Sequence, residues 1–131
     1  MEKIEKLLKM ARKVNDKINQ FENGIVSNLV KIDKLEEKLA ELEEKLEKIK
    51  EKYMKTLQAY TSSKELQEKE LVNLLKNDKE AKKLIEEIEK IKKEIKNTIF
   101  VNKQLEVNIR YKKETLELLK LEIKSLICKD D

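Results

Sequence analysis

The sequence predicts an all-α protein in which a short helix lies between two long antiparallel helices, as an elongated, coiled-coil-like bundle and a single domain over residues 1–131. Two observations support this prediction. Proline is absent and glycine occurs once, so the two residues that interrupt helices most strongly are almost missing. Apolar residues make up 39% of the chain and charged residues 44%, and the apolar ones recur at intervals of three and four instead of alternating as in a strand.

The first predicted element is a long helix over about residues 3–60. When the chain is written in heptads with positions a to g, the apolar residues fall at a and d, which face a partner helix. These residues are Ile4, Leu7, Ala11, Val14, Ile18, Phe21, Ile25, Ile32, Leu35, Leu39, Leu42, Leu46, Ile49, Tyr53 and Tyr60. Gly24 and Asn28 interrupt the pattern, because glycine costs about 1 kcal/mol relative to alanine inside a helix and asparagine favours helix starts. Since the heptad register continues past them, we expect a continuous or kinked helix.

The second element is a short helix over about residues 63–76. The segment Thr61-Ser62-Ser63 ends the heptad pattern. Ser62 and Glu65 have the spacing of a capping box, in which each side chain accepts a hydrogen bond from the other residue's backbone N–H. Leucines give this helix its apolar residues, which are Leu66, Leu71, Leu74 and Leu75.

The third element is a long helix over about residues 78–127, and Asn77 with Glu80 repeats the capping-box spacing at its start. Its a and d positions form a second apolar seam. The apolar members are Ala81, Leu84, Ile88, Ile91, Ile95, Leu105, Ile109, Leu116, Leu119, Ile123 and Leu126. Polar residues enter this seam at Thr98, Asn102 and Lys112, and such residues weaken a coiled coil while fixing its register. We therefore expect the C-terminal half of the helix to be held loosely by its own chain and open to a partner.

A second row of large apolar residues, here called the outer stripe, lies on the last helix outside its seam. It consists of Phe100, Val107, Tyr111, Leu118 and Leu121, at heptad positions c and f. These positions point away from the seam. A chain so rich in charge is expected to place five large apolar residues there only if something covers them. We predict that the outer stripe binds a partner.

Three kinds of cover are compatible with the outer stripe. The first is the N-terminal part of the chain, where several apolar residues also lie outside the a and d seam. They are Leu8, Met10, Val26, Leu29 and Val30. The second is an amphipathic helix of another protein, which would lay its apolar face along the stripe. The third is a second copy of the chain, as a homodimer.

Composition argues against several functional classes. The formal charge is +4, but the signs alternate along the helices, and Glu106 and Glu114 flank the basic residues around Tyr111, so we expect no nucleic-acid site. Histidine is absent and Cys128 is the single cysteine, so we expect no catalytic triad, no zinc site, no cofactor and no enzymatic activity. An unpaired cysteine fits a reducing compartment. No apolar run approaches the roughly 20 residues that cross a bilayer, so we expect a cytoplasmic protein without membrane insertion.

The last helix also resembles a known family. The segment from Asn102 to Tyr111, Asn-Lys-Gln-Leu-Glu-Val-Asn-Ile-Arg-Tyr, continues to Leu116-Glu-Leu118-Leu119 and is similar to the C-terminal helix of FlgN-type flagellar export chaperones. That family shows an Asn, a Leu three residues on, a Leu-x-aromatic pair and then Leu-x-Leu-Leu. Residues 25–35 resemble the polar step in the family's long first helix, although Asn28 stands where the family usually has an acidic residue. Residues 66–75 correspond to its short middle helix.

The resemblance implies a cytoplasmic chaperone of type III flagellar export. Such a protein binds the C-terminal amphipathic helices of hook-filament junction proteins and prevents their premature assembly. The family also delivers its partners to the export gate, where a tyrosine of the C-terminal helix is implicated, and Tyr111 is the one tyrosine of this helix. The alternative is a structural or oligomerising coiled-coil protein without chaperone activity, in which the outer stripe would be covered by another copy.

Overall fold

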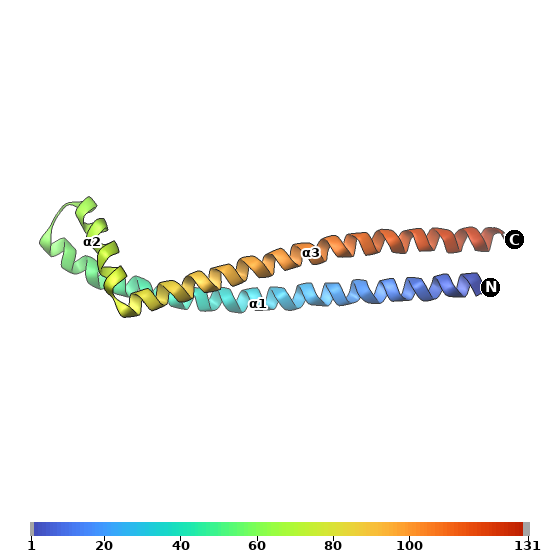
Figure 1. Cartoon of the computed structure of the whole chain (residues 1–131), viewed down its shortest axis with the longest axis horizontal. Helices are drawn as coiled ribbons and strands as arrows, with labels where there is room; N and C mark the ends of the chain where they lie inside the picture. The colour runs from blue at the N-terminus through green and yellow to red at the C-terminus, as the bar shows by residue number, and fades with distance from the viewer. Residues whose placement is uncertain (1, 130–131) are drawn as a thin grey trace. The chain divides into compact units, whose positions relative to one another are not determined.

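The computed structural model describes residues 2–129, and these residues form three α-helices joined by short connections (Figure 1). Helix α1 covers Glu2–Tyr60, α2 covers Lys64–Asn77 and α3 covers Lys79–Lys129. The described range contains no strand. The prediction of an all-α fold with two long helices and a short one between them is confirmed, with boundaries within two residues of those expected.

Helix α1 runs through Gly24 and Asn28 without a break, which confirms the expectation from the heptad register. The glycine lies where α3 comes close. A Cβ atom added at Gly24 would lie 3.4 Å from Cδ1 of Leu105, at the short end of ordinary carbon contacts. The missing side chain therefore gives the Leu105 side chain room against α1, which offsets part of the poor helix propensity of glycine.

Both short connections are capped one residue later than the sequence predicts. The side chain of Ser63, not Ser62, accepts a hydrogen bond from the Leu66 N–H at 3.4 Å and caps α2. Asp78, not Asn77, caps α3, because its Oδ1 accepts from the Ala81 N–H at 2.9 Å. Each pair of neighbours offers two suitable caps, and the capping-box spacing favours the first of each pair, because only Ser62 and Asn77 have a glutamate three residues on. The structure uses the second residue of each pair.

The turn before each helix determines which of the two neighbouring residues is the N-cap. Asn77 is still the last residue of α2, and the first extended backbone conformation after it is that of Asp78, whose N–H donates to the Leu74 carbonyl at 3.0 Å. After α1, the Thr61 hydroxyl accepts from the Ser63 N–H at 3.2 Å. The side-chain amide of the buried Gln67 donates to the Thr61 carbonyl at 2.8 Å. These bonds delay the start of α2 to Lys64.

The chain divides into two compact units. Unit 1 contains the first part of α1, up to Lys31, and the part of α3 from Thr98 onward, whereas unit 2 contains Ile32–Asn97. The predicted single domain stays a prediction, because this division concerns contacts and does not test whether either unit folds alone.

In unit 2 all three helices contribute to one apolar core. Its buried members are Leu42, Leu46, Leu75, Ala81, Leu84, Ile88 and Ile91. Leu71 of α2 and Tyr53 of α1 pack against this cluster. An ion pair between Lys92 Nζ and Glu43 Oε1, 3.9 Å apart, joins α3 to α1 at the surface. The predicted a and d residues form this core, with Leu75 added by the short helix.

In unit 1 the two long helices run antiparallel and meet along a single seam. Its buried apolar residues are Leu7, Ile18, Ile109 and Leu119. A polar layer interrupts it, where Asn28 Nδ2 donates to Asn102 Oδ1 at 2.8 Å and Asn102 Nδ2 donates to the Ile25 carbonyl at 3.4 Å. Asn102 is only 6% exposed, so its amide is satisfied from inside the protein. The polar residue that the sequence places in the seam is therefore a specific connection between α1 and α3.

A pH-dependent connection joins α1 to the start of α3 within unit 2. The Tyr53 hydroxyl donates a hydrogen bond to Asp78 Oδ2. This bond, followed by the one from the Ala81 N–H, lowers the pKa of the Asp78 carboxyl. The bond to the Asp78 carboxylate, followed by desolvation, raises the pKa of Tyr53. The pair is thus strongest with an ionised aspartate and a neutral tyrosine.

We expect this pair to stabilise the fold between two pH limits. Because the pKa of Asp78 is lowered in the folded protein, its carboxylate stabilises the fold fully above the unfolded-state pKa of about 4. This stabilisation is lost as the pH falls through the lower folded-state pKa. The raised pKa of Tyr53 gives a contribution that is present below about 10 and lost as the pH rises through the higher folded value.

Melting temperatures of the natural protein, Asp78→Asn and Tyr53→Phe between pH 2 and pH 11 provide the measurement. Asparagine keeps the cap but cannot ionise, so the gap between the natural protein and Asp78→Asn should shrink below about pH 4. The gap to Tyr53→Phe should shrink above about pH 10. Gaps that stay constant over the whole range would show that the pair does not couple folding to ionisation.

Candidate functional site

Exposed apolar side chains gather in unit 1. Among the described residues, thirteen exposed large apolar side chains lie in unit 1 and three in unit 2. Those of unit 1 are Leu8, Met10, Val26, Leu29, Val30, Ile99, Phe100, Val101, Val107, Tyr111, Leu118, Leu121 and Ile127, and those of unit 2 are Tyr60, Leu66 and Val72. Large apolar side chains exposed together in one part of a charged protein are typical of an interaction site. Unit 1 is therefore where a binding site is expected.

The five residues of the outer stripe are all exposed in the structure. Val107 is 40% exposed, and Phe100, Tyr111, Leu118 and Leu121 are between 60% and 67% exposed. Their neighbours Ile109 and Leu119 in the seam are buried. The helix thus separates its two apolar rows as the heptad positions predict, one toward α1 and one toward solvent.

The possibility that the N-terminal part of the chain covers the outer stripe is wrong for the described structure. The residues considered for that role, Leu8, Met10, Val26, Leu29 and Val30, are themselves between 42% and 61% exposed. The cause is geometric. Helix α1 meets α3 along the a and d positions, and a straight helix in that place cannot also reach positions c and f on the opposite side of α3.

The outer stripe has the spacing of a second coiled-coil seam. From Phe100 to Leu121 the positions c and f follow at alternating intervals of four and three residues, which is the heptad interval of 3.5. Two further residues, Gln104 and Glu114, occupy this row between the apolar ones. Sequence reasoning from apolar residues alone missed them, although their heptad positions place them there. A shallow depression on this face is lined by Phe100, Lys103, Gln104, Val107 and Asn108.

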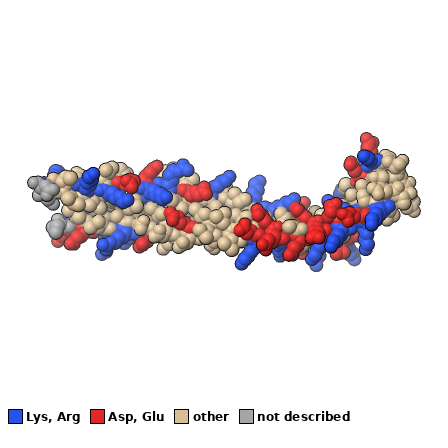
Figure 2. Space-filling view, turned by 180° about the vertical axis from the view of Figure 1, so that it is seen from behind, with Lys and Arg blue, Asp and Glu red and all other residues tan. Residues whose placement is uncertain are grey.

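Charge is distributed unequally between the units. Unit 2 contains 17 basic and 17 acidic residues, whereas unit 1 contains 14 basic and 10 acidic ones, so the whole formal charge of +4 belongs to unit 1. On the face in Figure 2, acidic and basic side chains lie densely over the long helices of unit 2, whereas uncharged surface separates them over unit 1 and is broad at the end that contains α2. Unit 1 is therefore both less charged and more basic than unit 2.

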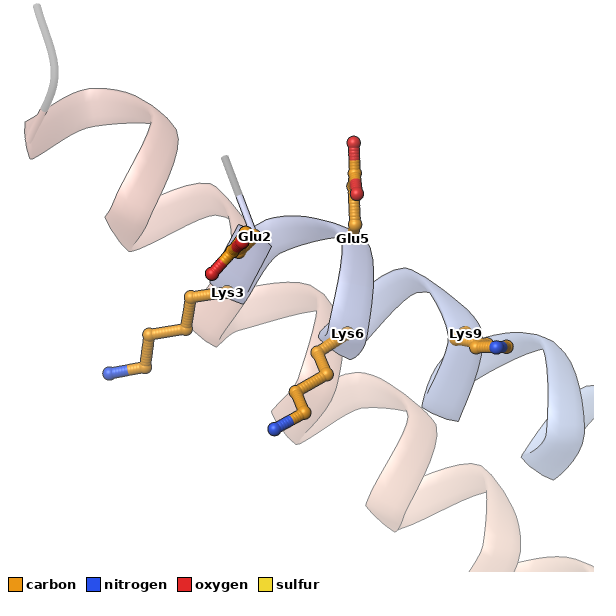
Figure 3. A pocket seen from close by; sticks show the side chains of 5 residues that line it. All are labelled: Glu2, Lys3, Glu5, Lys6 and Lys9. Atoms are coloured by element: carbon orange, nitrogen blue, oxygen red, sulfur yellow. The ribbon is translucent and has the colours of Figure 1, made fainter.

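Another depression lies at the start of α1 and has a different character. It is lined by Glu2, Lys3, Glu5, Lys6 and Lys9, all of them charged. In Figure 3 the side chains of Lys3 and Lys6 extend to the same side, while Glu5 points away from them. Solvated charges of both signs without an apolar wall do not define a ligand, so this depression is not a candidate site.

The described residues offer no group of three Asp, Glu or Cys side chains placed to hold a metal ion. Cys128 is exposed near the end of α3. Within the described range, every helix is too short or too polar to span a bilayer. Comparison of the chain with models of protein families, with curated proteins and with solved structures found no match.

Proposed function

We propose that this protein binds an amphipathic helix of another protein along the outer stripe, as a cytoplasmic chaperone of flagellar export. The single observation that supports this proposal most is the exposure of the five stripe residues, on the side of α3 opposite its seam. An apolar helix face aggregates when it is free, so a chaperone for it needs a complementary apolar row. The outer stripe has this character.

The size of the stripe sets the strength of binding. A large apolar side chain contributes about 1.5–3 kcal/mol when it is fully buried, whereas association costs about 4–15 kcal/mol in lost freedom. Five such residues, already partly buried against their own helix, contribute an amount comparable with this cost and leave little net affinity. The partner must therefore bury an apolar face of its own, which an amphipathic helix can supply along several turns. Phe100 and Tyr111 are the expected anchors, since aromatic side chains dominate such interfaces.

The resemblance to FlgN-type chaperones supports the narrower identification of the partner. The residues that carry it, from Asn102 to Tyr111 and on to Leu119, include both seam residues and stripe residues. On this basis the partners are the C-terminal helices of hook-filament junction proteins, held before secretion so that they do not assemble prematurely. Tyr111 would then have a second role in docking to the export gate.

The test is a pair of charge substitutions in the outer stripe. Val107→Glu with Leu118→Glu should abolish binding of a synthetic C-terminal helix of a junction protein, because each glutamate would have to be desolvated in the interface. The far-ultraviolet circular dichroism and the melting temperature should stay nearly unchanged, since both residues are exposed. Fluorescence anisotropy with a labelled peptide measures the binding.

The matched control is Leu66→Glu with Val72→Glu on α2. It uses the same residue types, and these positions are 52% and 51% exposed. The control should bind the peptide with the affinity of the natural protein. Full-strength binding by the stripe variant would remove the outer stripe from consideration.

A second candidate function is that of an oligomerising coiled-coil protein. The heptad spacing of the outer stripe supports it, because a row with this period also suits another copy of α3. Light scattering coupled to gel filtration distinguishes the two. The coiled-coil function predicts a stable oligomer that Val107→Glu with Leu118→Glu dissociates, whereas the chaperone function predicts no such oligomer.

A further inference from the structure

We infer that the helix bound by the outer stripe carries acidic residues along one edge of its apolar face, the edge that meets position b of α3. This inference rests on the proposed function and specifies the chemistry of the partner. It is based on the row of residues that borders the stripe at heptad position b. With successive residues turned by 100°, position b lies directly beside position f on the helix surface. Among the described residues of unit 1 the row consists of Lys103, Arg110, Glu117 and Lys124.

The cations of this row are available to a partner. Lys103, Arg110 and Lys124 are exposed, and none of them makes an ion pair within the described residues. The one acidic member, Glu117, already has a cation of its own, because Lys120 Nζ lies 3.5 Å from its Oε1. Lys103 also lines the depression that contains Phe100 and Val107. Positive charge therefore borders the apolar surface directly.

The opposite border of the stripe is different. Along α3 in unit 1, position g contains Val101, Asn108, Thr115, Glu122 and Lys129, so uncharged residues predominate there and the two charges have opposite signs. An asymmetric border of this kind favours a helix with carboxylates on the edge that meets position b, because complementary charges at the rim of an interface select its partner and its orientation.

Glu114 adds a second requirement inside the stripe. It lies at position f, between Tyr111 and Leu118, and is exposed in the free protein. A partner that covers Leu118 and Tyr111 must come close to this carboxylate. A lysine or arginine opposite Glu114 would satisfy it, whereas an apolar residue there would leave it desolvated without a partner. The expected partner thus interrupts its apolar face with one basic residue.

The same border argues against a second copy as the occupant. When two identical helices pair antiparallel through the same face, each edge row meets its own counterpart. Lys103, Arg110 and Lys124 of one copy would then face the same cations of the other, which is unfavourable. In a parallel pair they would face position g, which offers one carboxylate. A helix of another protein with one acidic edge fits this surface better than either arrangement.

Two helical peptides of identical composition and net charge provide the test. Both have the same leucine-rich apolar face with one lysine at its centre. One has glutamates on both edges of that face and lysines on its far side, and the other exchanges these two sets. Because both edges are changed, the result does not depend on the direction in which the peptide binds.

With the whole 131-residue chain at low salt, the peptide with acidic edges should bind about tenfold or more tightly than its isomer, the expected sum of several rim ion pairs. The difference should diminish in 0.5 M NaCl, since salt screens charges at a solvated rim. Lys103→Glu with Arg110→Glu should reverse the preference. The control Lys90→Glu with Lys93→Glu makes the same change in net charge on the part of α3 in unit 2 and should preserve it.

The possible failures are distinguishable. Equal affinity for both isomers, lost in Val107→Glu with Leu118→Glu, would overturn the acidic-edge inference and leave helix binding by the stripe in place. Absence of binding by either isomer and by the junction-protein helix would overturn the proposed function itself. A stable dimer that the stripe variant dissociates would show that a second copy is the occupant.

Discussion

Leu42→Ala is expected to lower the free energy of unfolding by about 2–5 kcal/mol, whereas Phe100→Ala should change it by less than about 0.5 kcal/mol. The two residues have similar apolar character but opposite surroundings. Leu42 is buried in the core cluster of unit 2, where removal of its side chain leaves a cavity. Phe100 is 60% exposed, so its removal leaves no cavity behind. Urea denaturation followed by circular dichroism measures both values.

Leu84→Ala should lower the free energy of unfolding by a similar amount, because Leu84 belongs to the same core cluster on α3. A large loss of stability in both leucine variants and none in Phe100→Ala would mean that the outer stripe contributes nothing to folding. If Phe100→Ala is as destabilising as Leu42→Ala, the stripe is part of a core in solution and the partner-binding proposal fails.

Asn28→Leu is expected to lower the free energy of unfolding by about 1–3 kcal/mol, because it leaves the buried amide of Asn102 without its closest partner. The double variant Asn28→Leu with Asn102→Leu should recover this loss or exceed the natural protein, since two apolar residues then meet in the seam. The double variant is instead expected to pair its two helices in a less specific register. A buried asparagine pair fixes the register of two helices, and leucines pack in several registers.

A double-mutant cycle by urea denaturation measures the coupling of Asn28 and Asn102. Sedimentation velocity then shows whether the double variant forms one species or several. Additive effects of the two single substitutions would mean that the amides are not coupled. A single species with the oligomeric state of the natural protein would mean that the register is fixed elsewhere in the seam.

The heptad pattern predicted most of the fold, for a local reason. The position of a residue in a regular helix follows from counting, so residues such as Leu84, Ile109 and Leu119 could be assigned to the buried side of their helix from the sequence alone. The continuity of α1 through Gly24 followed from the same register. The caps were misplaced by one residue because Ser62 and Ser63, like Asn77 and Asp78, are nearly equivalent in chemistry and differ only in the geometry of the turn.

The environment of the outer stripe could not be predicted in the same way. Whether Phe100 or Tyr111 is covered depends on where other segments lie, and no periodicity within α3 contains that information. The division of the chain at Lys31 and Thr98 likewise reflects packing of α2 on one part of the long helices. Gln104 and Glu114 were overlooked because the stripe was recognised by its apolar residues and not by its spacing.

The two units also differ in how much apolar surface they bury. Nine of the buried apolar residues belong to unit 2 and four to unit 1 within the described chain, and only unit 2 has a third helix over its seam. Segments with fewer buried contacts open locally at a lower free energy than the rest of a fold. Unit 1 would therefore fray first and exchange its amide hydrogens fastest. A helix docked on the outer stripe would supply the third helix that this unit lacks, so partner binding and the local stability of the described part of unit 1 would be thermodynamically linked.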